Sequence, residues 1–287
     1  ISANAIYPLR IQGEICYLRF SQVSEKLEEN VLAELAFLDY LRSQGYPAME
    51  AVRSISGDQL VRKETPWGEY FASVFKRVAG KQISQTDFND EIMYAYGAAL
   101  GELHLLSRKY TNSGVKRWTH FDVLDWIELT LGELGLDQEP LQELALLRSE
   151  FDQLTISQDN YGLIHYDFEL DNVFYDETSH RCNVIDFDDA MYHWFVMDIV
   201  QALDAIRDEM ELDDGSYQEA VFLKGYHSQF EIEDQLLAMR PIFRRFAGLF
   251  QYTRIAQAIQ EHWENEPAWM VELREKLKRK MDEIGLS

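Results

Sequence analysis

Basic side chains are scarce in this chain of 287 residues, which has 27 Lys and Arg against 50 Asp and Glu and a formal net charge of −23 at pH 7. Nucleic acids and anionic membranes both require a basic surface, so we expect neither as a partner. The charge suits a cationic ligand, although acidity that serves only solubility explains it equally well.

Cysteine is nearly absent, and long apolar runs are missing. Cys16 and Cys182 lie far apart, each inside an apolar run, so we expect two buried thiols in a reducing compartment and a cytoplasmic protein. No segment approaches the ~18 uncharged apolar residues of a membrane span, and no signal-peptide pattern is visible. The chain begins with Ile1 rather than Met, so we expect that its natural start is missing.

The first 80 residues are typical of short strands around one helix. Two β-type runs flank Gln12-Gly13, a hairpin signal, and three more occupy 48–55, 59–64 and 70–78. Between them, spacings of four and three residues predict a helix over 25–43. Its inward stripe consists of Leu27, Val31, Glu34, Leu38 and Leu41. Glu34 is therefore a charge in an otherwise apolar row.

Beyond Gly80 the periodicity is mainly helical. The predicted helices are 87–110, 122–134, 139–154, 195–210, 216–230, 235–262 and 267–284. We therefore predict an α+β fold of two lobes. A small antiparallel β-rich N-terminal lobe takes residues 1–78, and a larger, mainly helical C-terminal lobe takes residues 79–287.

One acidic stretch, "LIHYDFELDNVFYDETSHRCNVIDFDDA" at 163–190, interrupts the helices. Two β runs, 172–175 and 182–185, are joined by six polar residues and predict a hairpin. Pairing these strands places Asn172 beside Asp186 at the open end, with Asp167 in the loop that leads into the hairpin. Three oxygen-bearing side chains converging on one point suit Mg²⁺, which usually brings phosphates with it.

The pattern His165-x-Asp167-x₄-Asn172, followed by Asp186 across a hairpin, resembles the catalytic core of kinases. More closely, it resembles the family of aminoglycoside phosphotransferases and choline kinases, which phosphorylate small molecules. The resemblance implies a protein-kinase-like fold with ATP between the lobes.

Other segments extend this resemblance. "YLRF" is similar to the family's third strand, with Arg19 where kinases carry the phosphate-binding Lys, and Glu34 is similar to the helix Glu that pairs with it. "GAALGELHLL", which contains His104, is similar to a helix of the family, and "SVFKRVAG" resembles the hinge between its lobes. Asp198 stands where the family has an Asp in the helix after the metal loop.

The resemblance implies a role for each residue of the set. Asp167 would be the catalytic base that accepts the proton of the substrate hydroxyl. Asn172 and Asp186 would hold Mg²⁺ against the triphosphate of ATP. Arg19, fixed by Glu34, would bind the α- and β-phosphates. The expected acceptor is a small, positively charged alcohol: an aminoglycoside, choline or ethanolamine, homoserine or another amino alcohol.

Some features of the family are missing. No Gly-rich phosphate loop is visible, since only Ser2-Ala3-Asn4 precedes the strand that resembles the family's second one. Truncation and loss of activity both explain this, so a non-catalytic kinase-like protein with a binding or structural role remains the alternative. A metal-dependent phosphohydrolase would need several His ligands close in sequence, and a regulated protein kinase would need an activation segment; neither is present.

Two further sets of residues have open roles. Asp188 and Asp189 suit either metal or substrate binding, or a solvated acidic loop. Aromatic and acidic residues of the C-terminal part suit either a wall that holds an ammonium group or ordinary helix packing. This set consists of Trp194, Tyr226, Phe250, Tyr252, Trp263 and Trp269 with Glu261, Glu264 and Glu266.

Overall fold

The structure, a computed structural model, describes residues 4–111, 114–135, 138–211, 215–260 and 266–285. It contains two compact units. The first unit takes residues 118–157 and 235–287, and the second takes 2–117 and 158–234. The lobe boundary expected at residues 78 and 79 falls inside the second unit and stays a prediction.

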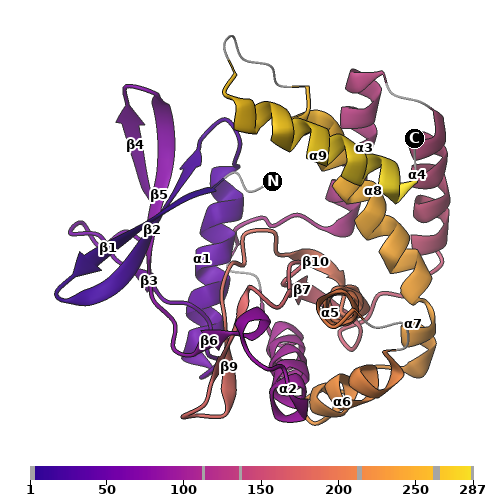
Figure 1. Cartoon of the computed structure of the whole chain (residues 1–287), viewed down its shortest axis with the longest axis horizontal. Helices are drawn as coiled ribbons and strands as arrows, with labels where there is room; N and C mark the ends of the chain where they lie inside the picture. The colour runs from indigo at the N-terminus through magenta and orange to yellow at the C-terminus, as the bar shows by residue number, and fades with distance from the viewer. Residues whose placement is uncertain (1–3, 112–113, 136–137, 212–214, 261–265, 286–287) are drawn as a thin grey trace. The chain divides into compact units, whose positions relative to one another are not determined.

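The second unit opens with a five-stranded antiparallel sheet (Figure 1). Its strand order is β1-β2-β5-β3, and β4 pairs with β5. The strands are β1 (Asn4–Ile11), β2 (Glu14–Gln22), β3 (Ala51–Val52), β4 (Val61–Thr65) and β5 (Gly68–Lys76). The first hairpin turns at Gln12 and Gly13, whose φ angles of 51° and 91° match the left-handed pair that a tight hairpin needs.

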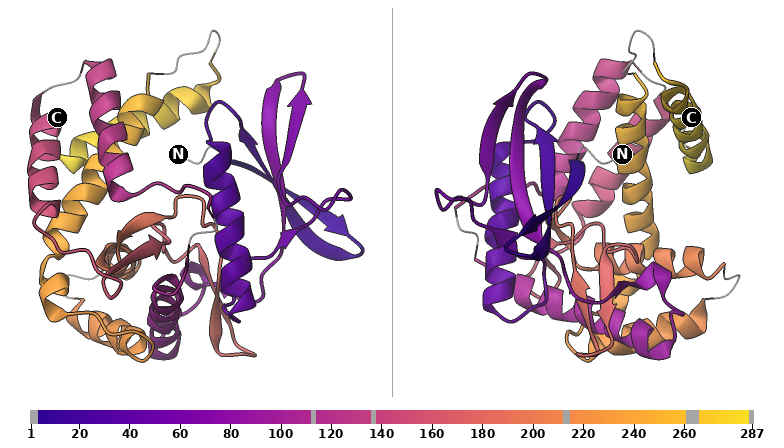
Figure 2. Two further views of the ribbon diagram at one scale, coloured as in Figure 1. Left: turned by 180° about the vertical axis from the view of Figure 1, so that it is seen from behind. Right: turned by 60° about the vertical axis from the view of Figure 1, so that its left-hand side comes forward.

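One helix, α1 (Glu28–Ser43), runs beside this sheet (Figures 1 and 2). The predicted inward stripe is largely confirmed, because Val31, Glu34, Leu38 and Leu41 are all buried. Leu27 is the exception and is 47% exposed. The helix begins at residue 28, so Leu27 is its N-cap and lies outside the helical periodicity.

Short strands frame the acidic stretch. The predicted hairpin is present as β8 (Val173–Asp176) and β9 (Arg181–Val184), with β6 (Lys81–Gln82) on the other edge of β8. A second pair, β7 (Tyr161–Ile164) with β10 (Met191–Trp194), was not predicted. A four-residue run directly before a helix carries too little periodicity to be recognised, and its partner lies about 30 residues earlier in the chain.

Three helices complete the second unit: α2 (Asp90–Ser107), α5 (Val196–Glu209) and α6 (Ser216–His227), with a 3₁₀ turn, η1 (Ile83–Gln85), before α2. Glycines allow α2 and α6 to cross in close contact. A Cβ on Gly97 would lie 2.0 Å from the Phe222 carbonyl oxygen, and one on Gly225 would lie 2.0 Å from that of Tyr94. No side chain fits at either position.

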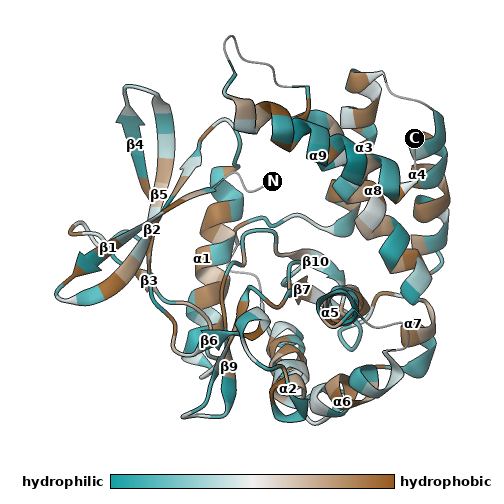
Figure 3. Cartoon of the chain, viewed as in Figure 1, coloured by the Kyte–Doolittle hydropathy of each residue, from teal (hydrophilic) through white to brown (hydrophobic). Residues whose placement is uncertain are grey.

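The first unit is helical and contains α3 (His120–Leu134), α4 (Gln138–Phe151), α8 (Arg240–Ala258) and α9 (Ala268–Ile284); α7 (Asp234–Ala238) begins at the last residue assigned to the second unit. The prediction of one helix over 235–262 is wrong, because α8 restarts near Pro241, which cannot donate a backbone hydrogen bond. The Phe151 ring packs on Phe243 and Phe246. Hydrophilic residues dominate α9, which has no buried residue (Figure 3).

Strands and helices together confirm the predicted α+β class. Over the described ranges, every helix is too short or too polar to cross a bilayer.

Candidate active site

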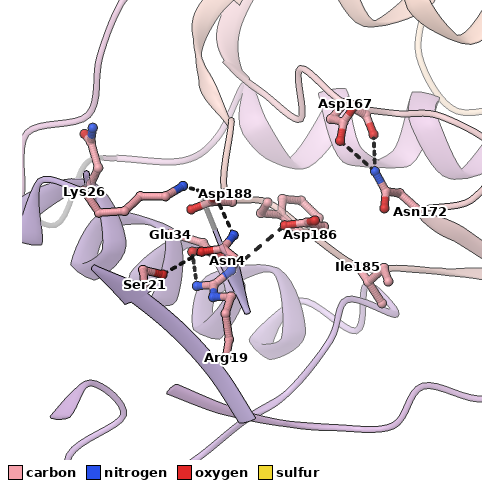
Figure 4. A network of polar contacts seen from close by, with 12 residues as sticks. Asn4, Arg19, Ser21, Lys26, Glu34, Asp167, Asn172, Ile185, Asp186 and Asp188 are labelled. Carbon is pink, nitrogen blue, oxygen red and sulfur yellow. Dashed lines mark hydrogen bonds and ion pairs between the residues drawn. The ribbon is translucent and has the colours of Figure 1, made fainter. Parts of the chain in front are cut away.

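Asp167 lies in the loop between β7 and β8 and is held by Asn172 (Figure 4). The Asn172 Nδ2 group donates to Asp167 Oδ2 at 2.9 Å and to the Asp167 carbonyl oxygen at 3.0 Å. Both donors of the amide face Asp167, so the Asn172 Oδ1 atom points away from it. The five-residue spacing predicted from the sequence is thus a direct contact.

The residue before Asp167 has an unfavourable backbone conformation. Tyr166 has φ +63°, a left-handed value that costs energy for a residue with a Cβ. Asp198, fully buried on α5, accepts the backbone N–H groups of His165 at 2.9 Å and Tyr166 at 2.8 Å. These two bonds hold the strained turn that aims Asp167, a function that suits the family position predicted for Asp198.

A buried histidine supports Asp198 from behind. Burial lowers the pKa of His104, so its ring is neutral. Its Nε2–H then donates to Asp198 Oδ2 at 3.1 Å, and its Nδ1 accepts from the Tyr226 hydroxyl at 2.8 Å. The close crossing of α2 and α6 brings Tyr226 within reach of this ring.

His165 links the loop that carries Asp167 to residues 185–190, here called the metal loop after the role predicted for Asp186. Its Nδ1 accepts the Asp167 N–H at 3.2 Å, and its Nε2 donates to the Ile185 carbonyl at 2.9 Å. Burial lowers the pKa of His165 and keeps the ring neutral, which these two bonds require. The ring therefore serves as a hydrogen-bonding strut rather than a base.

The β8–β9 hairpin brings Asn172 and Asp186 together. Val173 pairs with Val184, and the Ile185 N–H donates to the Asn172 carbonyl at 3.0 Å. Asp186 follows at φ +61°, which ends the strand and turns the chain. This register places both residues at the same end of the hairpin, where Figure 4 shows Asn172 turned toward Asp167 and Asp186 toward Arg19.

Arg19 on β2 and Glu34 on α1 form a buried two-pronged ion pair. The Nη1–Oε1 and Nη2–Oε2 distances are 2.9 and 2.6 Å. Burial alone disfavours the guanidinium charge, but the Glu34 carboxylate outweighs it and holds the pKa of Arg19 above its ordinary value. Arg19 Nη1 also lies 4.0 Å from Asp186 Oδ1, so the pair faces the metal loop.

Asp167 and Asp186 both have raised pKa values. Burial, then the neighbouring Glu169 and Asp189, raises the pKa of Asp167 to about 8. Burial and the Glu34 carboxylate raise the pKa of Asp186 to about 6, although Arg19 opposes this. Burial is the largest cause of both shifts and the neighbouring carboxylates add to it, so a cation bound here would lower both pKa values.

The donor set fits Mg²⁺. Asp186 offers a carboxylate that is 42% exposed, and Asn172 offers its amide oxygen. The described residues contain no group of three or more His, Cys, Asp and Glu side chains arranged for a metal ion. Mg²⁺ is typically held by one or two protein oxygens, with phosphates and water supplying the rest, so two donors and excess negative charge are sufficient.

Several residues of this network have no signal in the sequence. Burial disfavours the charge of Asp188, but the charges of Lys26 and Arg19, with hydrogen bonds from Lys26 and Asn4, lower its pKa to about 2 (Figure 4). Asp188 is therefore an ion-paired side chain in the structure rather than a solvated one. Arg117, from the segment after α2, donates to backbone carbonyls around Asp188. These partners lie 70 or more residues apart in the chain, beyond the reach of spacing arguments.

Most of the aromatic residues considered for an ammonium-binding wall are packed in the core. Trp194, Tyr226, Phe250 and Tyr252 are buried, whereas Trp269 is 62% exposed. Trp263, Glu261 and Glu264 lie outside the described residues.

Comparison with known proteins identifies the family of this chain. Residues 16–236 match the phosphotransferase enzyme family. An amicoumacin kinase of Bacillus subtilis (strain 168) is 25% identical over 263 residues, which is 88% of this chain and 77% of that protein.

Two solved structures share the fold. An amicoumacin kinase in complex with AMP-PNP and Ca²⁺ has a TM-score of 0.80 at 23% identity, covering 99% of this chain and 86% of that one. A microcompartment-associated aminopropanol kinase has a TM-score of 0.69 at 19% identity, covering 100% and 87%. The predicted kinase-like fold is confirmed, and an ATP analogue with a divalent cation in the first structure accords with the predicted cofactors. The family match over 16–236 also confirms the predicted enzyme class: the chain belongs to the phosphotransferase enzyme family.

Proposed function

We propose that the protein transfers the γ-phosphate of Mg²⁺-bound ATP to a hydroxyl group of a small, positively charged molecule. The observations that support this proposal are the Asp167–Asn172 contact and the approach of the buried Arg19–Glu34 pair to Asp186, at the end of the hairpin that Asn172 begins. A solvated acidic loop would not need a buried, two-pronged ion pair facing it.

Each side chain has a task that its contacts support. Asp186 Oδ and Asn172 Oδ1 would hold the metal, which screens the phosphate charge when bound. The N–H groups of Arg19 that Glu34 leaves free would contact phosphate oxygens. Ile6 and Tyr17 share the sheet face of Arg19, because Ile6 pairs with Arg19 across the hairpin and Tyr17 lies two residues before Arg19. They are 53% and 36% exposed and offer an apolar surface for the nucleobase.

Asp167 is suited to accept a proton. Burial and then the neighbouring carboxylates raise the pKa of Asp167 to about 8 in the unliganded protein, and a cation bound beside it would lower that pKa and favour the ionised form that accepts a proton. Asn172 fixes its position through two hydrogen bonds. The side chain would orient the acceptor hydroxyl and take its proton as the phosphoryl group transfers.

A cationic acceptor follows from the local charge. Asp167 is surrounded by the carboxylates of Glu169, Asp189 and Asp186. Mg²⁺ and Arg19 would neutralise part of this negative charge. The triphosphate of ATP is also negative and would neutralise much of the positive charge of Mg²⁺ and Arg19. An ammonium group on the acceptor would balance the remainder, and the aminopropanol kinase of the same fold is named for such an amino alcohol.

The test is an ATP-consumption screen over amino alcohols, aminoglycosides, neutral sugars and carboxylic acids, with Asp167→Asn as the inactive control. We expect turnover with an amine-bearing alcohol and none in the control. Nucleotide-dependent thermal stabilisation without turnover of any acceptor would instead favour a non-catalytic kinase-like protein.

A further inference from the structure

Arg117 is a buried arginine that the catalytic scheme does not use. It lies in the segment after α2 and is 6% exposed. Its guanidinium makes four hydrogen bonds, each to a backbone carbonyl oxygen. A buried charge is costly unless it is well bonded, so four bonds of this kind indicate a specific task.

Three of the four bonds hold the segment directly after Asp186. The Nε–H group donates to the Ala190 carbonyl, and Nη2 donates to the carbonyls of Phe187, at 3.3 Å, and Asp188. The Ala190 N–H closes a turn onto the Phe187 carbonyl at 3.2 Å. The Arg117 guanidinium therefore fixes the turn formed by residues 187–190. This turn follows Asp186, whose backbone has a left-handed conformation.

The fourth bond reaches another element. Arg117 Nη1 donates to the Asn30 carbonyl at 2.5 Å, in the first turn of α1, the helix that carries Glu34. Burial lowers the pKa of Arg117, and the carboxylates of Glu34, Asp188 and Asp189 oppose that shift. One planar group thus contacts both the metal loop and the helix that fixes Arg19.

We propose that Arg117 is a positioning residue that couples α1 to the metal loop, so that Asp186 and the Arg19–Glu34 pair are set together. The inference rests on the proposed function, because it assigns the metal to Asp186. Lysine cannot replace Arg117, since a point charge on a flexible stem cannot span four carbonyls on two elements.

The variants are Arg117→Lys and Arg117→Gln, with Arg42→Lys as the matched control. Arg42 lies on α1, which Arg117 contacts, and donates to the Ala48 carbonyl at 2.8 Å and to the Glu50 carboxylate at 2.8 Å rather than to residues 187–190. Mg²⁺-dependent binding of AMP-PNP is measured by calorimetry. We expect binding about tenfold weaker in the Arg117 variants, the size expected for one lost charge-assisted hydrogen bond, and no change in the control.

Hydrogen exchange of peptides spanning 186–190 in the unliganded protein gives a readout without metal. We expect faster exchange in Arg117→Lys and wild-type exchange in Arg42→Lys. Equal exchange and equal Mg²⁺ dependence in all variants would overturn the coupling. Loss of folding in both Arg117 variants, measured by circular dichroism, would also overturn the coupling, because Arg117 would then stabilise the whole unit rather than position the metal loop. If wild type itself binds no Mg²⁺–AMP-PNP, the proposed function fails, and the exchange measurement still decides whether Arg117 holds the turn.

Discussion

Replacing Asp167 by Asn should make the unliganded protein more stable while removing its activity. The pKa of Asp167 rises from an ordinary 3.8 to about 8, mainly through burial and then through neighbouring carboxylates. The folded state therefore binds the Asp167 proton more tightly than the unfolded state does. The contribution of Asp167 to the free energy of unfolding therefore falls as the pH rises from about 4 to 8, and it stays at its lowest value above pH 8. An Asn side chain has the same shape, keeps an oxygen for Asn172, and never acquires the charge.

The magnitude follows from the pKa difference. The pKa of Asp167 rises by about four units, and at roughly 1.4 kcal/mol for each unit this destabilises the folded state by about 6 kcal/mol at high pH. Solvent screens a partly exposed group, so we halve this cost to about 3 kcal/mol. For a chain of this length the melting temperature should rise by about 6 °C at pH 9, and by much less at pH 5. Thermal unfolding followed by circular dichroism, without divalent cations, measures this.

Asp176→Asn is the matched control. Asp176 accepts hydrogen bonds from Ser179 and Thr178, which lower its pKa, so this substitution should not stabilise the protein. An Asp167→Asn protein that melts at or below wild type at pH 9 would refute the charge argument. We also expect kcat to fall about 10²-fold or more, with little change in ATP affinity.

Three further outcomes are expected. Asp186→Ala should abolish Mg²⁺-dependent nucleotide binding in a titration with AMP-PNP, and unchanged metal dependence would move the ligand elsewhere. The kcat/KM for the acceptor should fall as KCl rises to physiological ionic strength while kcat changes little; a salt-insensitive reaction with a neutral acceptor would argue against a cationic substrate. Gly225→Ala should lower the melting temperature, because its Cβ would lie 2.0 Å from a carbonyl oxygen of α2, whereas Gly132→Ala, with nothing within 4 Å, should raise it slightly or not at all.

The part of the candidate site formed by residues close together in the chain could be predicted from the sequence. Asp167, Asn172 and Asp186 fall within twenty residues, and hairpin pairing alone brings the last two together. Glu34 was recognisable because helical periodicity placed it in an apolar row, where an unpaired carboxylate would be unstable. The catalytic roles of these residues remain proposals, whereas their mutual placement follows from short-range geometry.

Other parts of the site depend on contacts between distant segments. Tyr226 and His104 are 122 residues apart and meet only because glycines let α2 and α6 cross closely. Lys26 and Asp188 are 162 residues apart. No spacing rule links such pairs, because side-chain contacts between elements are set by how the elements pack.

The sequence by itself determined the kinase-like class, the hairpin and the acidic charge of the site, because each depends on residue types at short spacing. Only the tertiary structure decided the raised pKa values of Asp167 and Asp186 and the four hydrogen bonds of the Arg117 guanidinium. A pKa depends on how far burial removes a group from water and on which charges lie beside it, and a buried guanidinium finds its carbonyls only when distant segments have packed. Both features depend on which residues lie close together in the folded protein, and the spacing of residues along the chain does not specify this.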